Sequence, residues 1–199
     1  TNVSLGLPDS LIRLVKVASD NKVFAATTSN GIYQYHNGIW SSLNQGLPTS
    51  NILATGFAKT PNGMMYMLTT TGAVYFWNGV IWSNITYNLP TTGRAISFSQ
   101  NGILYAGIFN GGVYKFDGIN SWTLVGNPMP NIFVINLHVG SNDTIYALCN
   151  SNNIYRCHKN GGDWTLINNG LPAVNMNFIA SDNQDRIFVG SSFSGNGVI

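Results

Sequence analysis

The side chains that could carry out chemistry are sparse in this sequence, and their spacing does not bring them together. Hydrolysis of a glycosidic bond needs a pair of carboxyl groups at one site, and recognition of an acidic sugar also needs a group of arginines. The acidic residues are Asp9, Asp20, Asp117, Asp143, Asp163, Asp182 and Asp185, and the arginines are Arg13, Arg94, Arg156 and Arg186. No Ser-His-Asp arrangement and no zinc-ligand spacing stands out. We therefore predict no catalytic residue, no metal site and no cofactor.

Three smaller features have alternative interpretations. The segment DNQD (Asp182 to Asp185) carries oxygen ligands of the kind that Ca²⁺ prefers, but a polar turn is the favoured interpretation. His138 could line a channel, and a hydrogen-bonded core histidine is favoured over that role. Cys149 and Cys157 flank one predicted hairpin, where a two-residue turn would point them to opposite faces and a bulge would bring them to one face. The sequence leaves a disulfide between them open.

The elements that must position these side chains repeat along the chain. The tryptophans Trp40, Trp82, Trp122 and Trp164 are spaced by 42, 40 and 42 residues. The prolines Pro8, Pro48, Pro90, Pro130 and Pro172 are spaced by 40, 42, 40 and 42 residues. Two independent residue types therefore keep one pitch, which predicts an internal structural repeat.

Each repeat contains short apolar runs separated by turn residues, as in VFAATTSNGIYQYHNGIW from Val23. Short runs between Gly, Asn and Asp turns predict β-hairpins, and no window has a helical period. Four antiparallel strands in about 41 residues are the size of a β-propeller blade. A β-sandwich does not require a fixed pitch, and an open solenoid would expose a sheet edge at each end, so both alternatives are disfavoured.

These patterns predict an all-β chain that forms one domain over residues 1–199, a five-bladed β-propeller of four-stranded antiparallel blades. The blades are expected at about residues 5–44, 45–86, 87–126, 127–168 and 169–199, the last together with residues 1–4. The N-terminal TNVSLGLP aligns with the end of a Trp strand, so it is expected to pair with the last blade and close the ring. About seven residues are lacking between Ile199 and the next expected Trp, which suggests a trimmed, split or engineered chain.

The Trp and the Gly-Leu-Pro segment are interpreted as a structural joint between blades. The Trp ring is expected to pack from the outer strand against the neighbouring blade. Glycine allows the turn, leucine packs between blades, and proline fixes φ without donating a hydrogen bond.

The segment GLPTSNILATGFAKTPNGMMYMLTTTGAVYFWNGVIW, from Gly46 to Trp82, resembles the repeat of two-component-regulator-type propellers. The segment YRCHKNGGDW, from Tyr155 to Trp164, is similar to a degenerate Asp-box, the hairpin turn of sialidase-like and BNR-repeat propellers. Five repeats with a shared strand also resemble the organisation of tachylectin-type five-bladed lectins, whose sequence motif is absent. The resemblance covers nearly the whole chain and implies the fold. It implies no single function, since these families include sensors, lectins, assembly factors and enzymes.

The loops between the second and third strands of each blade are expected to share a face with the Gly-Leu-Pro loops. They carry small polar groups and occasional aromatic rings, which suit sugar hydroxyls or a peptide backbone, although turn chemistry explains most of them. The candidate ligand-binding residues are Asn30, Thr71, Phe109, Asn110, Asn152, Phe193 and Asn196. All aspartates except Asp9 are expected in turns on the opposite face, so a carboxylate pair is not expected beside these loops.

Composition narrows the functional class. Only 8% of the residues are charged, and Asn, Ser, Thr and Gly supply the polar surface, which favours an extracellular or periplasmic protein. The basic residues do not cluster, so nucleic acid is not an expected partner. No apolar run reaches the roughly 18 residues that span a bilayer, so membrane insertion is not expected, and no signal peptide is visible.

The function predicted from these observations is non-enzymatic recognition of a glycan or protein surface by a secreted, monomeric propeller with several copies of its site. One alternative is a sensory or scaffold module from a larger protein. A more remote alternative is the remnant of a sialidase-like hydrolase.

Overall fold

The computed structural model describes residues 6–8, 11–17, 22–48, 52, 54–60, 64–90, 93–129, 132–171, 175–182 and 184–191. The chain forms two compact units, residues 1–86 and 87–199, and each is described in turn. Within the described residues, no helix is long and apolar enough to cross a membrane. The single helical element there is a 3₁₀ turn, η1 (Asn150–Asn152).

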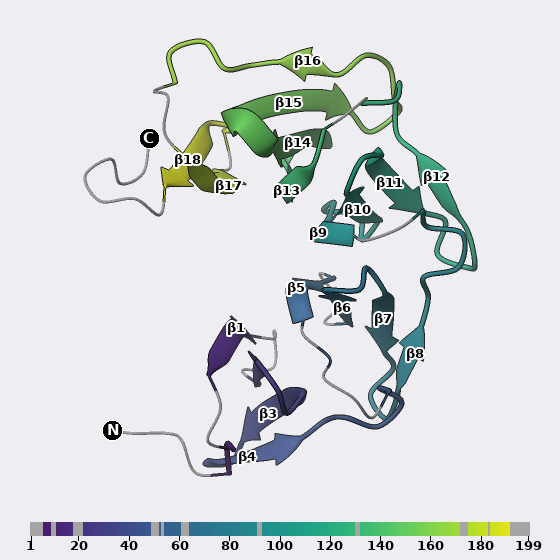
Figure 1. Ribbon diagram of the computed structural model, residues 1–199, viewed down its shortest axis with the longest axis vertical. Coiled ribbons are helices and arrows are strands. Elements are labelled where there is room, and N and C mark those ends of the chain that lie inside the picture. The colour runs from purple at the N-terminus through teal and green to yellow at the C-terminus, as the bar shows by residue number, and fades with distance from the viewer. Residues whose placement is uncertain are drawn as a thin grey trace. The chain divides into compact units, whose positions relative to one another are not determined.

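The first unit contains two four-stranded antiparallel sheets (Figure 1). The strands of the first sheet are β1 (Ile12–Val17), β2 (Val23–Thr27), β3 (Ile32–His36) and β4 (Ile39–Ser42). Those of the second sheet are β5 (Ala54–Lys59), β6 (Met65–Thr69), β7 (Val74–Trp77) and β8 (Trp82–Asn84). In both sheets each strand is followed along the chain by its neighbour in space.

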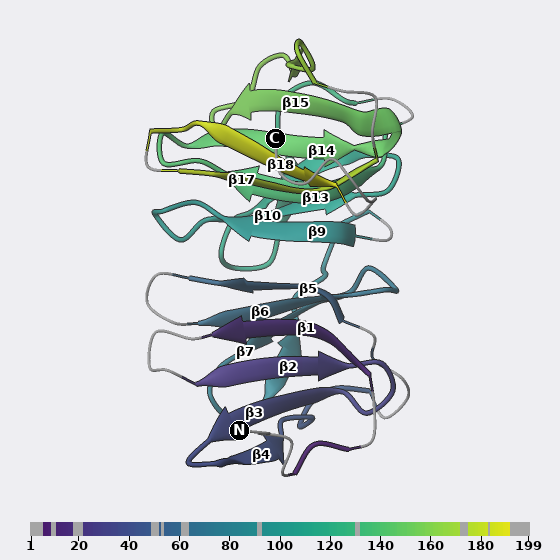
Figure 2. The same ribbon diagram turned by 90° about the vertical axis from the view of Figure 1, so that its left-hand side faces the viewer.

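The second unit contains two more sheets of the same kind and one hairpin. The strands of the third sheet are β9 (Gly93–Phe98), β10 (Leu104–Ile108), β11 (Gly112–Phe116) and β12 (Trp122–Leu124). Those of the fourth are β13 (Val134–Val139), β14 (Thr144–Cys149), β15 (Asn153–His158) and β16 (Thr165–Leu166), and the hairpin is β17 (Met176–Ser181) with β18 (Ile187–Ser191). The arrows of β13, β14 and β15 alternate in direction in Figure 2, as antiparallel pairing requires.

The predictions of an all-β chain and of four-stranded antiparallel sheets at the repeat pitch are confirmed. Each described sheet lies within one of the segments expected to be a blade. The predicted closing strand at residues 1–4, and residues 192–199 that would complete the last sheet, lie outside the described residues.

Every first strand has an irregular register at its second residue. In the first sheet Ile12 pairs with Thr27 and Leu14 with Ala26, so Arg13 is the extra residue of a β-bulge. The residues at this position in the five sheets are Arg13, Thr55, Arg94, Ile135 and Asn177. A bulge bends its strand and re-aims the side chain that it carries. Arg13 and Arg94 therefore occupy equivalent positions.

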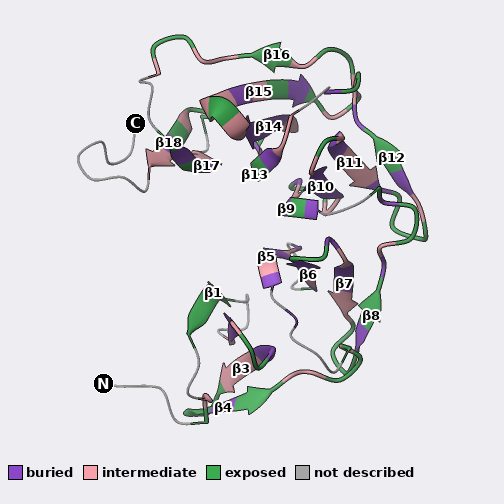
Figure 3. Cartoon of the chain, viewed as in Figure 1, coloured by how far each residue is buried: buried purple, intermediate pink, exposed green. Residues whose placement is uncertain are grey.

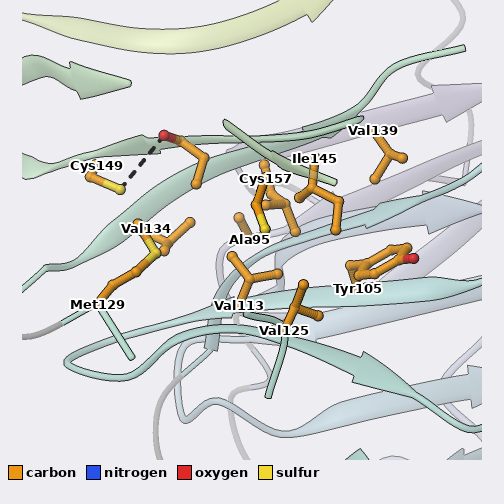
Figure 4. Packing of buried hydrophobic residues seen from close by; sticks show 12 residues of the cluster. Ala95, Tyr105, Val113, Val125, Met129, Val134, Val139, Ile145, Cys149 and Cys157 are labelled. Atoms are coloured by element: carbon orange, nitrogen blue, oxygen red, sulfur yellow. Dashed lines mark hydrogen bonds between the residues drawn. The ribbon is translucent and has the colours of Figure 1, made fainter. Parts of the chain in front are cut away.

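The apolar core lies between neighbouring sheets of each unit. In the first unit Ala26 of β2 packs with Ala54 and Phe57 of β5. In the second unit Val113 of β11 packs with Val134 of β13, in the cluster shown in Figure 4. A further cluster joins the fourth sheet to the β17–β18 hairpin, through Leu148 and Met176 among others. Within each unit, neighbouring sheets therefore bury their apolar side chains against each other, since a single sheet cannot cover its own faces.

Glycine is required where the third and fourth sheets meet at Gly107. A Cβ at Gly107 of β10 would lie 2.3 Å from Cγ1 of Val134, which is well inside van der Waals contact. Val134 itself is fully buried. The small residue in the second strand of one sheet thus receives the first strand of the next sheet.

A Trp side chain holds the fourth strand of the second sheet to the preceding connector. Trp82 is 2% exposed, and its indole N–H donates to the carbonyl of Leu43 at 2.7 Å. Its backbone N–H donates to the carbonyl of Gln45 at 2.9 Å. Gly46 has φ of +83°, and a Cβ there would lie 2.2 Å from the Trp82 carbonyl oxygen. The glycine of the Gly-Leu-Pro motif is therefore needed both for the turn and for close approach to the Trp strand.

The third sheet makes the same joint with a different residue. Asn88 replaces the glycine, and its side-chain amide donates to the Trp122 carbonyl at 3.1 Å while accepting the Trp122 N–H at 2.8 Å. The preceding residue, Tyr87, takes the positive φ of 41°.

The fourth sheet differs from the prediction in one detail. Trp164 precedes β16 and is half-buried, because its turn is longer and includes Gly161 and Gly162, both at positive φ. Its indole N–H still donates to a connector carbonyl, that of Val125, at 3.0 Å.

The Trp82 joint leads to a stability prediction. We expect Trp82→Ala to lower the free energy of unfolding by about 3–5 kcal/mol, because it removes a buried ring and leaves a cavity. Urea unfolding followed by circular dichroism measures this change. Ile81→Ala is the matched control, because Ile81 is 42% exposed and should change the free energy by less than about 1 kcal/mol. A loss below about 1 kcal/mol for Trp82→Ala would contradict a structural role.

Candidate functional site

An open pocket lies in the first unit, between the β2–β3 loop and the connector that leads to β5. Its volume is about 360 Å³, and its lining residues are Ser29, Asn30, Gly31, Asn44, Leu47, Pro48 and Ile52. One wall is therefore a loop between second and third strands, and the other contains the leucine and proline of a Gly-Leu-Pro motif. Asn30, a predicted ligand-binding residue, lines this pocket.

The pocket wall is fixed by the side chain of Asn44. Its Oδ1 accepts the N–H of Ile32 at 2.8 Å, and its Nδ2 donates to the carbonyl of Asn30 at 2.9 Å. Gly31 is needed here, because a Cβ would lie 2.2 Å from Asn44 Oδ1 and φ is +83°. The hydroxyl of Thr27 accepts the Asn30 N–H at 2.9 Å. The loop is thus held by side-chain hydrogen bonds that make it part of the sheet.

The same clamp recurs in other sheets. Asn168 accepts the N–H of Ile154 at 2.8 Å and donates to the carbonyl of Asn152 at 3.1 Å. Thr86 supplies only the acceptor, for the N–H of Val74 at 2.9 Å. This role was not predicted from the sequence, although an Asn stands four residues after Trp40 and again after Trp164, which was a signal for it.

The pocket lining combines apolar carbon with hydrogen-bonding groups. Leu47, Pro48 and Ile52 supply aliphatic surface, and Ile52 is 9% exposed. The loop on the other side supplies a hydroxyl, amides and backbone groups. Such a lining can hold an extended segment or a ring by apolar contact and a few hydrogen bonds.

The other predicted residues take various positions. Thr71 is exposed, and its hydroxyl lies 2.9 Å from that of Thr69. Asn110 and Asn152 have φ of 57° and 60°, a left-handed conformation that Asn tolerates better than most residues. Oδ1 of Asn152 also accepts the N–H of Met176 at 3.1 Å. The requirements of the turn are therefore enough to explain an asparagine at positions 110 and 152. The ligand-binding role of both residues stays a prediction.

Of the remaining three predicted residues, Phe109 is the one that the structure describes. Phe109 is half-buried, and its ring is stacked on that of Phe133. Phe193 and Asn196 lie outside the described residues.

Polar side chains of the fourth sheet and of the β17–β18 hairpin form hydrogen bonds that the sequence did not indicate. His138 Nε2 of β13 lies 2.8 Å from the hydroxyl of Ser181 of β17, 43 residues away. Asp185 Oδ1 accepts the N–H and the hydroxyl of Ser141, both at 2.9 Å. Burial lowers the pKa of His138, although the charge of Asp185 opposes the shift. These bonds connect the fourth sheet to the hairpin, which agrees with the favoured interpretation of a hydrogen-bonded histidine.

In the DNQD segment the carboxylate of Asp182 closes a turn. Asp182 Oδ1 accepts the N–H groups of Gln184 at 2.9 Å and Arg186 at 3.0 Å, and its Oδ2 accepts the guanidinium Nε of Arg186 at 2.6 Å. Among the residues that the structure describes, no three His, Cys, Asp or Glu side chains come together as metal ligands. Polar-turn contacts thus account for Asp182, which agrees with the favoured interpretation of a polar turn.

The two cysteines are free thiols. Cys149 pairs with Asn153, whereas Cys157 pairs with Ile145, four residues further along the ladder. Both are buried, and Figure 4 shows them apart within the cluster. Burial raises the pKa of Cys149 to about 12. The disulfide that the sequence left open is absent, and both side chains act as apolar core residues.

Comparisons with known proteins agree with the architecture. Residues 39–196 match the sequence model of the DUF6242 beta propeller domain. No curated protein matches the chain.

Solved structures of other proteins are similar in fold. Virginiamycin B lyase from Staphylococcus aureus has a TM-score of 0.76 at 18% identity, over 93% of this chain and 64% of that one. YCF48 from Cyanidioschyzon merolae has a TM-score of 0.71 at 18% identity, over 96% of this chain and 69% of that one. The extracellular domain of a hybrid two component system from B. thetaiotaomicron has a TM-score of 0.73 at 17% identity, over 96% of this chain and 26% of that one. At these identities the likeness shows the fold alone. This chain spans 64% of the length of the lyase.

The His138 contact leads to a prediction about pH. The folded protein binds a proton at His138 less readily than the unfolded chain does, because burial lowers the pKa. Stability contributed in this way is present at neutral pH and is lost as the pH falls from the unfolded value near 6.5 through the folded value. We expect the free energy of unfolding to fall between about pH 7 and pH 5, and His138→Gln to make that slope shallower.

Urea unfolding at several pH values measures the slope in both proteins. His36→Gln, at an exposed histidine, is the matched control and should leave the slope of the natural protein in place. An unchanged slope in His138→Gln would show that His138 does not carry the effect.

Proposed function

We propose that this chain, which belongs to the DUF6242 β-propeller domain family, is a non-enzymatic recognition module that binds a segment of a partner protein on its loop face. The observation that carries the proposal is the pocket between the Ser29–Gly31 loop and the Leu47–Pro48 connector. Its lining offers amides, a hydroxyl, backbone groups and aliphatic carbon. These groups bind a ligand but do not transfer protons at neutral pH, so binding suits them better than catalysis.

The comparisons support a protein ligand. YCF48, which has the same kind of fold, has been solved bound to a D1 peptide. The similar extracellular domain belongs to a two component system, which supports the alternative that the module is the sensory part of a larger protein. Virginiamycin B lyase shows that the fold can also carry an enzyme. We place the module outside the cytoplasm, in an extracellular or periplasmic setting, because its surface is poor in charge.

A glycan is the second candidate ligand, favoured by the recurrence of the loop. Thr71, Asn110 and Asn152 lie in loops equivalent to that of Asn30. A site built from hydroxyls and amides binds weakly, because each hydrogen bond adds only about 0.5–1.5 kcal/mol in water. Several such sites on one molecule would gain roughly 10²–10⁴ in avidity on a densely decorated surface.

We further propose that the propeller has five blades and closes into a ring. Two apolar sheet faces are exposed among the residues that the structure describes. The first of these faces lies on β1 and consists of Ile12, Val15 and Val17. Figure 3 shows β1 coloured as exposed. Their equivalents on β13, Val134, Leu137 and Val139, are buried against the third sheet.

The second exposed face lies on the β17–β18 hairpin, at Phe178 and Phe188. Gly190 pairs with Phe178 as Gly107 pairs with Ala95, so Gly190 is the equivalent of the glycine that receives Val134. The two exposed faces are therefore the two halves of one interface that is buried elsewhere in each unit. Ring closure would cover both.

Blocking the pocket tests the recognition function. We expect Ser29→Tyr to abolish binding of peptides selected from a displayed library, because a ring at this exposed loop position fills the pocket, and Asn30→Ala to weaken it by about five- to tenfold. A glycan array measured in parallel gives the second candidate the same opportunity. Ser83→Tyr, at an exposed position of β8, is the matched control. Binding that survives Ser29→Tyr would exclude the pocket, and binding to glycans alone would favour the second candidate.

An engineered disulfide tests the ring. In a background with Cys149 and Cys157 replaced by alanine, we expect Ile12→Cys with Gly190→Cys to oxidise to an internally bonded monomer. Gly107→Cys with Val134→Cys is the equivalent pair at a junction that the structure describes, where the Cβ positions are 2.8 Å apart and the strands must separate by about 1 Å to reach the roughly 3.8 Å of a disulfide. Non-reducing electrophoresis and mass spectrometry distinguish the products. Disulfide-linked oligomers, or free thiols where the equivalent pair is oxidised, would contradict five-bladed closure.

A further inference from the structure

An aromatic pair and an arginine come together at the junction of the third and fourth sheets. The rings of Phe109 and Phe133 are stacked, with centroids 3.8 Å apart and planes within 9°. The guanidinium carbon of Arg94 lies 6.0 Å from the centroid of the Phe109 ring. All three residues belong to the second unit, and they come from three separate segments: β9, the β10–β11 turn and the residue that precedes β13.

Each of the three residues is held by the backbone around it. Arg94 is the extra residue of the β9 bulge, between Gly93 and Ala95. The N–H of Phe133 donates to Asn150 Oδ1 at 2.9 Å, and its carbonyl accepts the N–H of Asn150 at 2.9 Å. Asn110, next to Phe109, has the left-handed φ of 57° that ends the strand in a tight turn. The group is therefore organised before any ligand arrives, which lowers the entropic cost of binding.

The guanidinium of Arg94 is the chemically active part. Arg94 is exposed, and the ion pairs among the described residues join Asp143 to Lys159 and Asp182 to Arg186. A distance of 6.0 Å is at the outer limit of a cation–π contact, so the ring places the guanidinium without satisfying its donors. A planar guanidinium binds a carboxylate with two parallel hydrogen bonds. The half-buried Phe rings beside it offer apolar surface for a neighbouring side chain.

We propose that Arg94, Phe109 and Phe133 form a subsite for a carboxylate that lies next to an apolar side chain of a bound polypeptide. The proposal rests on the recognition function proposed above and names the chemistry of its ligand. The carboxylate could be a chain terminus or an acidic side chain, because both present the same two oxygens. An apolar side chain in the adjacent position would pack on the rings.

The first sheet contains a natural control for this subsite. Arg13 is the extra residue of the β1 bulge, as Arg94 is of the β9 bulge. The residue equivalent to Phe109 is Thr28, which follows the strand partner of Ile12 as Phe109 follows that of Gly93. Arg13 thus offers the same exposed guanidinium without the aromatic rings. Charge alone would make the two arginines equivalent, whereas the proposed subsite requires Arg94.

The test uses small probes in a heteronuclear NMR titration. The probes are N-acetylphenylalanine, its uncharged amide, and the amide of N-acetyl-phenylalanyl-glutamate. We expect the first or third probe to shift the amide signals of residues 94, 109, 110 and 133, and the uncharged amide to bind at least about threefold more weakly. Which of the two acids binds better identifies a terminal or a side-chain carboxylate. Added salt should weaken binding, because the contact is exposed.

Variants connect the signal to the residues. Arg94→Gln should weaken binding of the acid about three- to tenfold, Arg94→Lys should restore part of it, and Arg13→Gln should have no effect. Equal affinity for acid and amide, equal effects of Arg94→Gln and Arg13→Gln, or no shift at these residues would overturn the proposal. Ser29→Tyr, which tests the pocket, lies in the other unit and is not expected to change these shifts. Failure of the subsite and failure of the pocket are therefore separate results.

Discussion

The joint between a Trp strand and the preceding connector is the constraint on which the rest of this structure depends. A four-stranded sheet of about thirty residues cannot bury both of its faces, so its stability comes from the next sheet. The indole of Trp82 stabilises the contact between the first and second sheets in two ways. Its ring is buried, and its N–H takes the carbonyl of Leu43, which would otherwise be an unpaired acceptor at the end of the preceding sheet. Gly46 then packs against the Trp82 backbone, where no side chain fits.

The position of the candidate site follows from this joint. Because Gly46 is fixed against Trp82, the next two residues, Leu47 and Pro48, are placed opposite the β2–β3 loop. Asn44, two residues before Gly46, holds the loop from the other side by bonding to Ile32 and to Asn30. A segment of five residues thus provides one wall of the pocket and anchors the other. A ligand in this pocket would meet rigid backbone, which favours a defined binding geometry over adaptation.

Much of the architecture could be predicted because the repeat makes one local rule visible several times. The Trp pitch and the glycine turns predicted four-stranded antiparallel sheets, and the described strands agree. The contacts between repeats could not be predicted in this way. The bond between His138 and Ser181 depends on which residues of β13 and β17 stand opposite each other. The stack of Phe109 on Phe133 joins the β10–β11 turn to the residue before β13, which lies in the next repeat. Trp164 precedes its strand because two glycines lengthen one turn, an irregularity that pitch alone does not resolve.

The bulge in each first strand separates what the fold requires from what a ligand could select. The backbone there is the same in all five sheets, but the side chain it carries is an arginine, a threonine, an arginine, an isoleucine and an asparagine in turn. A core position could not vary in this way, because its volume and polarity are set by close-packed neighbours. At a bulge the side chain is re-aimed out of the ladder, so its chemistry is free to change without loss of the fold. Recognition in this propeller is therefore best sought where the backbone repeats and the side chains do not.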